Sequence, residues 1–222
     1  MKVIIVSGVD GSGKSTQLAL LGKYLRSRGF KVKYLWLRWF AAFTYLLYLY
    51  AKLTRRTIIV RTRTRPIHVH IFWIDPLLRY SYPRLLLFDL ILWFILNKLV
   101  ARIKGCDVLL IDRFVLDVLV DLLWDVRDIK FLKSTLVRNM WGYAKSTVVL
   151  TVKPREAIKR KSDTISLREA AFKKKCFETL AKYLDIPILD TITTFRELLK
   201  PVSYTHLRAH ETEADLVCRL LL

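Results

Sequence analysis

The 222-residue chain is predicted to form one α/β domain, with a doubly wound, five-stranded parallel sheet and helices on both faces. Three features predict this fold. A strand, a glycine-rich turn, a helix and a second strand open the chain, and short β-branched runs then alternate with helical stretches. Hydrophobic residues make up 53% of the chain, which is enough to bury a full core and excludes a disordered protein.

The opening βαβ unit occupies residues 2–36. Residues 2–7 are an apolar, β-branched run that stops at glycine, as a buried parallel strand does. A helix is predicted over 14–28, because leucines recur on one stripe and Gly29 follows as its C-terminal stop. A second strand is predicted over 30–36. Parallel strands joined by a helix imply a right-handed crossover.

The second half of the chain continues this alternation. Three further strands are predicted at residues 107–111, 146–152 and 186–189. A helix is predicted to follow the first of them and to end near Asp128, and Ser166 with Glu169 forms a capping box that opens another helix. We therefore expect a single domain over residues 1–200, with its ligands at the C-terminal ends of the strands.

Residues 37–104 fit the alternation poorly. Stretches 39–51 and 85–96 are apolar, but each is shorter than the ~20 residues that span a bilayer. We expect two buried or half-buried helices over the substrate side of the sheet. The alternative is a surface that contacts an anionic membrane, because basic residues lie between the two stretches. They include Arg55, Arg56, Arg61, Arg63 and Arg65.

The net charge of +20 favours anionic partners. Nucleotides, nucleic acid and an anionic membrane all fit this charge, and so does a basic enzyme whose ligands carry several phosphates. The cysteines Cys106, Cys176 and Cys218 are far apart, which excludes a disulfide framework or a cysteine-based zinc site and suits a reducing cytoplasm. We expect a cytoplasmic protein, with a membrane-peripheral location as the alternative.

Residues 201–222 are expected to be a non-native tail. From Ser203 the chain reads SYTHLRAHETEADLVCRLLL, which resembles translated sequencing-adapter sequence rather than part of a domain. The alternative is a genuine short C-terminal helix. The fold prediction therefore stops before this tail.

Residues 8–16, GVDGSGKST, form a P-loop motif. They match G-x-x-x-x-G-K-[ST] between a strand and a helix, which is the context that identifies the motif. Its glycines let backbone N–H groups surround phosphate oxygens, Lys14 reaches the β- and γ-phosphates, and the Ser15 hydroxyl binds Mg²⁺. The predicted cofactors are therefore ATP and Mg²⁺. The predicted nucleotide-binding residues of the loop are Gly8, Asp10, Gly11, Ser12, Gly13, Lys14, Ser15 and Thr16.

The triplet Asp112-Arg113-Phe114 ends the strand at 107–111, so its side chains should face the same crevice as the loop. Asp112 is predicted to join Ser15 in holding magnesium, and the guanidinium fork of Arg113 is predicted to hold a phosphate. The alternative is a salt-bridged pair at a strand end.

These motifs resemble those of the thymidylate kinase family of P-loop nucleoside monophosphate kinases. The resemblance rests on GVDGSGKST, on DRF, and on KPREAIKRK and YLDIPILD in the C-terminal third, so it covers the two ends of the chain and little of the middle. It implies the three-layer P-loop NTPase fold and transfer of the ATP γ-phosphoryl group to a nucleoside monophosphate. It also implies a homodimer that forms through helices beside the sheet.

The resemblance implies roles on the acceptor side of the site. Asp10 would lie by the sugar hydroxyl of the acceptor, and Arg113 and Arg38 would hold its phosphate. Phe88 falls where the family stacks the base, although plain core packing is the alternative for this side chain. Arg160 and Lys161 fall in the lid that closes over ATP. The predicted catalytic residues are Lys14, Arg38, Arg113 and Arg160.

The chain departs from the family at two acceptor-side positions. Residues 36–39 (WLRW) lack the family's proline, and Leu92 stands where the family has an arginine that reads the thymine edge. Removing that donor would leave a base carbonyl unpaired at ~1–3 kcal/mol. The sequence therefore predicts the reaction class without specifying thymidylate as the acceptor.

Three aspartates, Asp117, Asp121 and Asp125, are spaced to share one face of the helix after Phe114. Asp117 and Asp121 are predicted at the acceptor site, and a solvated helix face is the alternative. Taken together, the sequence predicts a magnesium-dependent phosphotransferase. The alternatives are a P-loop kinase with a different, membrane-associated acceptor, and a nucleotide-dependent nucleic-acid-binding protein. The last ranks lowest because the chain has few glycine-aromatic RNA-binding motifs.

Overall fold

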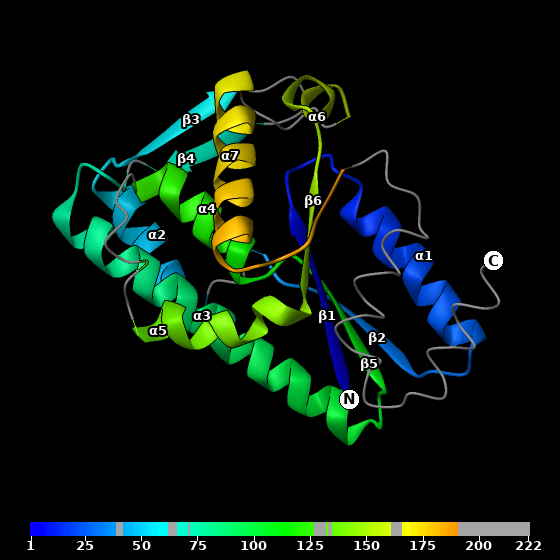
Figure 1. The fold of residues 1–222 in the computed structure, drawn as a ribbon. Helices are drawn as coiled ribbons and strands as arrows, with labels where there is room; N and C mark the ends of the chain where they lie inside the picture. Colours follow the sequence, from blue (N-terminus) through cyan, green and yellow to red (C-terminus); the bar gives the residue numbers. More distant parts are fainter. Residues whose placement is uncertain are drawn as a thin grey trace.

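The computed structural model describes residues 1–38, 42–61, 66–70, 72–126, 132, 135–160 and 166–190. Its main sheet contains the strands β1 (Lys2–Gly8), β2 (Val32–Trp36), β5 (Val108–Asp112), β6 (Thr147–Thr151) and β7 (Ile188–Asp190). These strands are all parallel and lie in the order β2-β5-β1-β6-β7. Figure 1 shows helices on both faces of this sheet. The predicted α/β class, with a doubly wound five-stranded parallel sheet, is confirmed.

The two faces of the sheet follow from the alternation of apolar residues along its strands. In β1, Ile4 and Val6 pack in one apolar cluster with Leu18 and Leu21, whereas Ile5 belongs to another. Successive side chains of a strand point to opposite faces, so each face receives its own helical layer. Helix α1 (Lys14–Ser27) covers the first face. Helices α3 (Pro76–Ile103), α4 (Val115–Val126) and α7 (Leu167–Tyr183) cover the second.

The smaller elements complete the described chain. They are α2 (Thr44–Leu53), β3 (Thr57–Arg61), β4 (Pro66–His70), α5 (Thr135–Met140), η2 (Trp141–Ser146) and α6 (Pro154–Arg160). Strands β3 and β4 form a separate antiparallel hairpin, which is not among the predicted strands. The predicted helix ending near Asp128 corresponds to α4, which is described as far as Val126, and its predicted last residues lie outside the described part of the chain.

The helices of residues 37–104 are capped by two buried aspartates. Asp75 precedes the Pro76 start of α3, and its carboxylate accepts hydrogen bonds from the backbone N–H groups of Leu77 and Leu78. Asp89, inside α3, accepts from the backbone N–H groups at the start of α2, including that of Thr44 at 2.8 Å. The helix α2 therefore spans Thr44–Leu53 where the stretch 39–51 was predicted, and α3 spans Pro76–Ile103 where the stretch 85–96 was predicted.

Helix α3 has a buried side and an exposed side. Its inner face supplies Leu78, Tyr82, Leu86, Leu90 and Phe94 to the core. Many of the apolar residues of its other face, and of α2, are exposed. Both helices are therefore half-buried, which is one of the two expected arrangements. Among the described residues, no helix has the combination of length and apolarity that a bilayer crossing needs.

Candidate functional site

The glycine loop, residues 8–16, connects the C-terminal end of β1 to α1. Gly8 has φ 137°, and a Cβ at this position would lie 2.0 Å from the carbonyl oxygen of Leu150 in the neighbouring strand. Gly13, at φ 78°, is the N-cap of α1 and supplies no capping side chain. The first N–H groups of α1 are thus left for another acceptor, and this is the geometry that binds anions.

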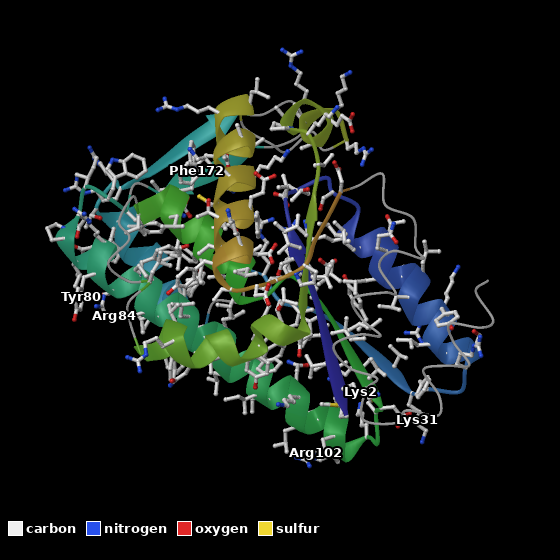
Figure 2. All side chains as sticks on the ribbon, viewed as in Figure 1. Lys2, Lys31, Tyr80, Arg84, Arg102 and Phe172 are labelled. Atoms are coloured by element: carbon white, nitrogen blue, oxygen red, sulfur yellow. The ribbon has the colours of Figure 1, made fainter. Side chains whose placement is uncertain are left out.

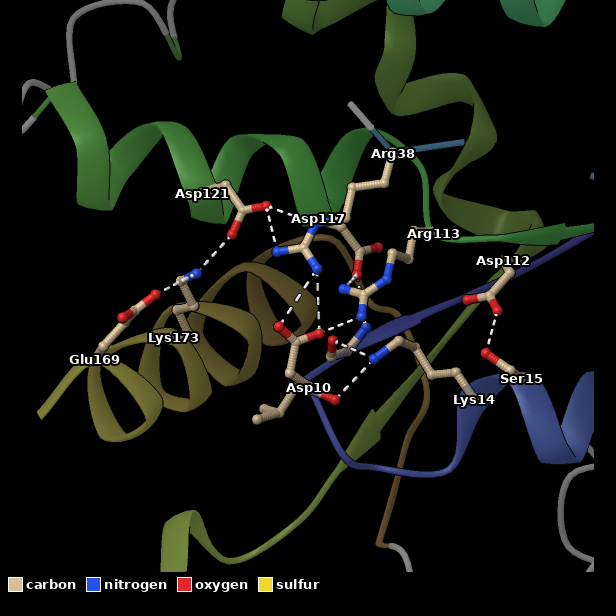
Figure 3. Close-up of polar contacts among 12 residues, drawn as sticks. Asp10, Lys14, Ser15, Arg38, Asp112, Arg113, Asp117, Asp121, Glu169 and Lys173 are labelled. Carbon is tan, nitrogen blue, oxygen red and sulfur yellow. Dashed lines mark hydrogen bonds and ion pairs between the residues drawn. The ribbon is translucent and has the colours of Figure 1, made fainter. Parts of the chain in front are cut away.

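Lys14 crosses the glycine loop on its inner side. Its ammonium is buried and donates to the carbonyl oxygens of Gly8 at 2.8 Å and Val9 at 2.7 Å. Burial, followed by the nearby positive charge of Arg113, lowers the pKa of Lys14 to about 8. The protein therefore holds a partly desolvated cation against the loop backbone (Figure 3), where an anionic ligand would gain most from it.

Asp112, the last residue of β5, faces Ser15 across the crevice. One carboxylate oxygen accepts from the Ser15 hydroxyl at 2.5 Å and from the Tyr34 hydroxyl at 2.7 Å. Its other oxygen, Oδ1, is buried and has no hydrogen-bond partner among the described residues, and the same is true of the Ser12 hydroxyl. An unpaired buried carboxylate oxygen beside a serine hydroxyl is a set of hard ligands that fits Mg²⁺.

Two protein ligands are few for a metal ion. Within the described ranges, no group of three or more His, Cys, Asp or Glu side chains could hold one. Mg²⁺ at phosphate-transfer sites is commonly held by one or two side chains together with substrate phosphates and water. Ser15 and Asp112 therefore fit a magnesium ion that arrives with a polyphosphate better than a resident structural ion.

Asp10 brings two arginines from distant segments to the glycine loop. Arg38, just after β2, directs Nη1 at both carboxylate oxygens of Asp10 at 3.3 Å. Arg113 makes a short ion pair with the same carboxylate through Nη2. Arg113 adopts a left-handed backbone conformation, φ 68°, directly after β5, which is uncommon for a residue with a side chain. Figure 3 shows both guanidinium groups converging on Asp10.

The charged network continues from Arg38 to helix α7. Arg38 Nη2 lies 3.1 Å from Asp121, and Asp121 also pairs with Lys173 at 2.8 Å. Lys173 pairs in turn with Glu169 at 2.7 Å. Burial disfavours the charged form of Asp121, but Lys173 and Arg38 outweigh it and lower its pKa. The network fixes Arg38 at its outer end while its Nη1 points at the loop.

Asp117 ties the start of α4 to the glycine loop. It is buried and accepts from the backbone N–H groups of Gly8 at 3.4 Å and Phe114 at 3.2 Å, and Arg113 Nη1 lies 3.5 Å from it. Burial raises its pKa. Asp125, on the same side of α4, is half-buried, and burial together with Asp121 raises its pKa to about 7. The alternative of a solvated aspartate face is therefore wrong.

The other predicted site residues are less closely associated with this network. Arg160 in α6 is exposed and donates to the Gly11 carbonyl at 3.5 Å, while Thr16 is exposed on α1. Lys161 lies outside the described residues. Phe88 is 46% exposed and packs edge-on against Phe43 with ring centroids 5.7 Å apart, so the core-packing interpretation is wrong. Its role in base stacking stays a prediction.

Sequence reasoning missed three members of the site, which are Tyr34, Lys173 and Glu169. The i,i+4 spacing of Glu169 and Lys173 was a visible signal of a helical ion pair, but nothing local indicates that the pair meets Asp121. Tyr34 carried no signal, because a tyrosine in an apolar strand is usual. It meets Asp112 only because β2 pairs with β5.

The chain was also compared with known proteins. No protein-family model matches it, and no curated protein matches it. The resemblance to thymidylate kinases therefore rests on the sequence motifs alone.

Proposed function

We propose that the protein is a magnesium-dependent phosphotransferase that moves the γ-phosphoryl group of ATP to a nucleoside monophosphate. One observation carries the proposal. Two guanidinium groups, Arg38 and Arg113, meet at Asp10 inside the same glycine loop that holds Lys14. Two guanidinium groups that can bind one phosphate thus lie next to a loop that can bind another phosphate. Phosphoryl transfer between two phosphorylated ligands needs both binding sites side by side.

On the donor side, the N–H groups at the start of α1 and the ammonium of Lys14 would bind the ATP phosphates. Lys14 now donates to the loop carbonyls of Gly8 and Val9, and phosphate oxygens would replace these acceptors. Ser15 and Asp112 would hold magnesium, which neutralises charge on the phosphates when bound. Arg160, which donates to the Gly11 carbonyl, would reach the donor from α6.

On the acceptor side, Arg38 and Arg113 would exchange Asp10 for the acceptor phosphate. Arg38 keeps Asp121 at its other nitrogens, so it can turn one N–H group to the ligand without losing its position. Asp10, released from the arginines, could then accept from a hydroxyl of the acceptor. Transfer would be in line and without a covalent intermediate, with positioning and charge stabilisation supplying the rate.

Steady-state kinetics with ATP, Mg²⁺ and a panel of nucleoside monophosphates test the proposal. The wild-type protein should phosphorylate at least one of them, and Lys14→Ala should lower the rate by about 1,000-fold or more. Lys23→Ala is the matched control, because Lys23 is an exposed lysine on the same helix. No transfer to any member of the panel, or full activity of Lys14→Ala, would show that the proposal is wrong.

A different acceptor is the second candidate. It is favoured by Leu92, which places an apolar side chain where a base-reading arginine is expected, and by the exposed apolar surface of α2 and α3 beyond it. An amphipathic monophosphate would suit such surroundings. If the nucleoside monophosphates fail while alkyl monophosphates are phosphorylated in a Lys14-dependent way, this candidate replaces the first.

A further inference from the structure

We propose that the outer surface of helices α2 and α3 docks on an anionic lipid bilayer. We call this surface the α2–α3 face. Its apolar residues are Tyr45, Leu46, Leu49 and Leu53 of α2 and Leu77, Phe88, Ile95, Leu99 and Ile103 of α3, all of them exposed. The proposal does not rest on the proposed kinase activity, because none of these residues except Phe88, a predicted base-stacking residue, is predicted at the site, and Phe88 is not needed for the test below.

Besides Tyr80, Leu96 and Val100, which lie outside it, five exposed apolar residues of α3 form one stripe. They follow one another at intervals of 11, 7, 4 and 4 residues from Leu77 to Ile103. At 3.6 residues per turn, these intervals keep all five side chains within an arc of about 80°. Ile95 and Leu99 are each 54% exposed and Ile103 is 76% exposed. An apolar stripe of this length on a helix with a well-packed inner side indicates a surface that is covered by something.

The face of α2 continues this stripe. Tyr45, Leu46, Leu49 and Leu53 share one side of α2, and Leu53 is 74% exposed. The two helices are joined at their exposed edges by the ring contact between Phe43 and Phe88, and both rings are about half exposed. This ring contact brings the exposed side of α2 next to the exposed side of α3.

The charge of this segment selects the partner. Residues 37–104 contain twelve Lys and Arg against two acidic residues, Asp75 and Asp89. Both aspartates are buried: Asp89 caps α2, and Asp75 caps α3 and pairs with Arg56 at 3.9 Å. Arg38 belongs to the charged network of the glycine loop, and the segment contains no further acidic residue to offset its other cations. The exposed basic residues of the two helices and their ends include Lys52, Arg55, Arg102 and Lys104.

Two arginines flank the α3 stripe directly. Arg84 and Arg102 are 18 residues apart, which is five helical turns, so they lie on the same side of α3. Arg84 follows Leu77 by seven residues, which is almost two turns, so both arginines lie at the edge of the apolar stripe. Figure 2 shows both side chains projecting from the outer margin of the molecule, Arg84 beside Tyr80. The Arg84 guanidinium lies 3.5 Å from the centre of the Tyr80 ring. Basic groups beside exposed leucine, isoleucine and aromatic side chains match the headgroup and acyl layers of an anionic bilayer.

A second copy of the chain fits this face less well. In a two-fold interface each copy would present the same cations to the other, and the α2–α3 face offers no exposed carboxylate to pair with them. Nucleic acid would satisfy the cations but not the aliphatic side chains between them, since nucleic-acid surfaces bind through phosphate contacts and aromatic stacking. An anionic bilayer satisfies both.

Co-sedimentation with vesicles tests the proposal. The full-length protein should bind phosphatidylcholine vesicles containing phosphatidylserine at about 0.15 M salt, and should bind pure phosphatidylcholine vesicles much more weakly. Arg84→Gln with Arg102→Gln should weaken binding about 25-fold. Ile95→Gln with Leu99→Gln should weaken it at least about tenfold while thermal unfolding is unchanged, because both side chains are exposed.

The matched controls lie on α1, across the sheet from the α2–α3 face. Lys23→Gln with Arg26→Gln removes the same charge, and Leu20→Gln removes an exposed leucine. Each should change vesicle binding by less than about threefold. Equal losses for the α1 and α3 pairs, or no binding to anionic vesicles, would overturn the proposal. A dimer that Ile95→Gln with Leu99→Gln dissociates, or RNA binding with the same dependence, would assign the face to another partner and also overturn it.

Discussion

The two sides of the site differ in how their polar groups are satisfied. On the donor side, around Ser15 and Asp112, a buried carboxylate oxygen and the Ser12 hydroxyl have no hydrogen-bond partner among the described residues. On the acceptor side, Arg38 and Arg113 both pair with Asp10. An unpaired buried group gains a partner when a ligand binds, whereas an ion pair must first be exchanged. Under the proposed function, a donor ligand would find unpaired groups at Asp112 and Ser12 and would exchange only the loop contacts of Lys14, whereas an acceptor would have to exchange the ion pairs of both arginines.

This difference follows from how the two sides are built. Ser15 and Lys14 belong to the loop and helix directly after β1, and Asp112 comes from the neighbouring strand, so a few backbone hydrogen bonds fix all of them. The acceptor side draws its groups from the ends of β2 and β5 and from α4 and α7. Long side chains from separate elements hold one another in place through charge, and a competing anion can redirect them.

The largest effect should come from the donor side. Asp112→Asn replaces the unpaired carboxylate oxygen and removes its charge, so we expect the turnover rate to fall about 100- to 1,000-fold and the Mg²⁺ concentration for half-maximal rate to rise. Titration of activity with Mg²⁺ measures both. Tyr34→Phe is the control, because it removes one hydrogen bond to Asp112 and keeps both oxygens. An unchanged Mg²⁺ dependence would show that Asp112 does not hold the ion.

Substitutions on the acceptor side should change the kinetics for the acceptor and leave those for ATP nearly unchanged. Arg113→Ala or Arg38→Ala should lower kcat/KM for the acceptor about 10- to 100-fold and leave KM for ATP within about twofold. Arg113→Lys should not restore the rate, because an ammonium lacks the planar fork. Arg26→Ala, on exposed α1, controls for loss of charge. An equal rise in both KM values would contradict the separation of the two sides.

The pH dependence of nucleotide binding should reflect Lys14. Its pKa is lowered to about 8, so the ammonium is present below that pH and is lost as pH rises through it. We expect the Kd for ATP to rise about tenfold between pH 7 and pH 9. Lys14→Met should bind weakly with a flat profile over the same range. A parallel rise in Lys14→Met, measured by calorimetry, would assign the titration to another group.

The smallest effect concerns Asp125, beside the acceptor-side network. Its pKa is raised from 3.8 to about 7 in the folded state, so folding favours the protonated carboxyl. The free energy of unfolding should therefore be highest below about pH 4 and should fall as pH rises towards 7, because the unfolded chain loses this proton first. Asp125→Asn should therefore be about 1–2 kcal/mol more stable than wild type at about pH 8 and similar at about pH 4. Urea unfolding at both pH values measures this. Asp185→Asn, at an exposed position, should show no such difference.

The sequence predicted the parts of this protein that depend on short-range patterns. The βαβ opening, the positions of the parallel strands and the glycine loop are all encoded within a few residues. Apolar alternation fixes which strand residues are buried, and glycines such as Gly8 and Gly13 allow backbone conformations that other residues rarely adopt. These constraints act locally, so they can be read without knowing what each segment packs against.

Only the tertiary structure decided which residues from distant segments contact one another. Arg38 meets Asp10 and Asp121, and Lys173 meets Asp121, because the ends of β2 and β5 are brought beside α4 and α7. The same packing turned Asp117 and Asp121 inwards and left Phe88, Ile95 and Leu99 outside. A row of aspartates or of apolar residues on a helix has the same spacing in the sequence whether it faces the core or the solvent. The partner that a helix face finds depends on the whole fold, and the free energy of that packing decides which side is buried.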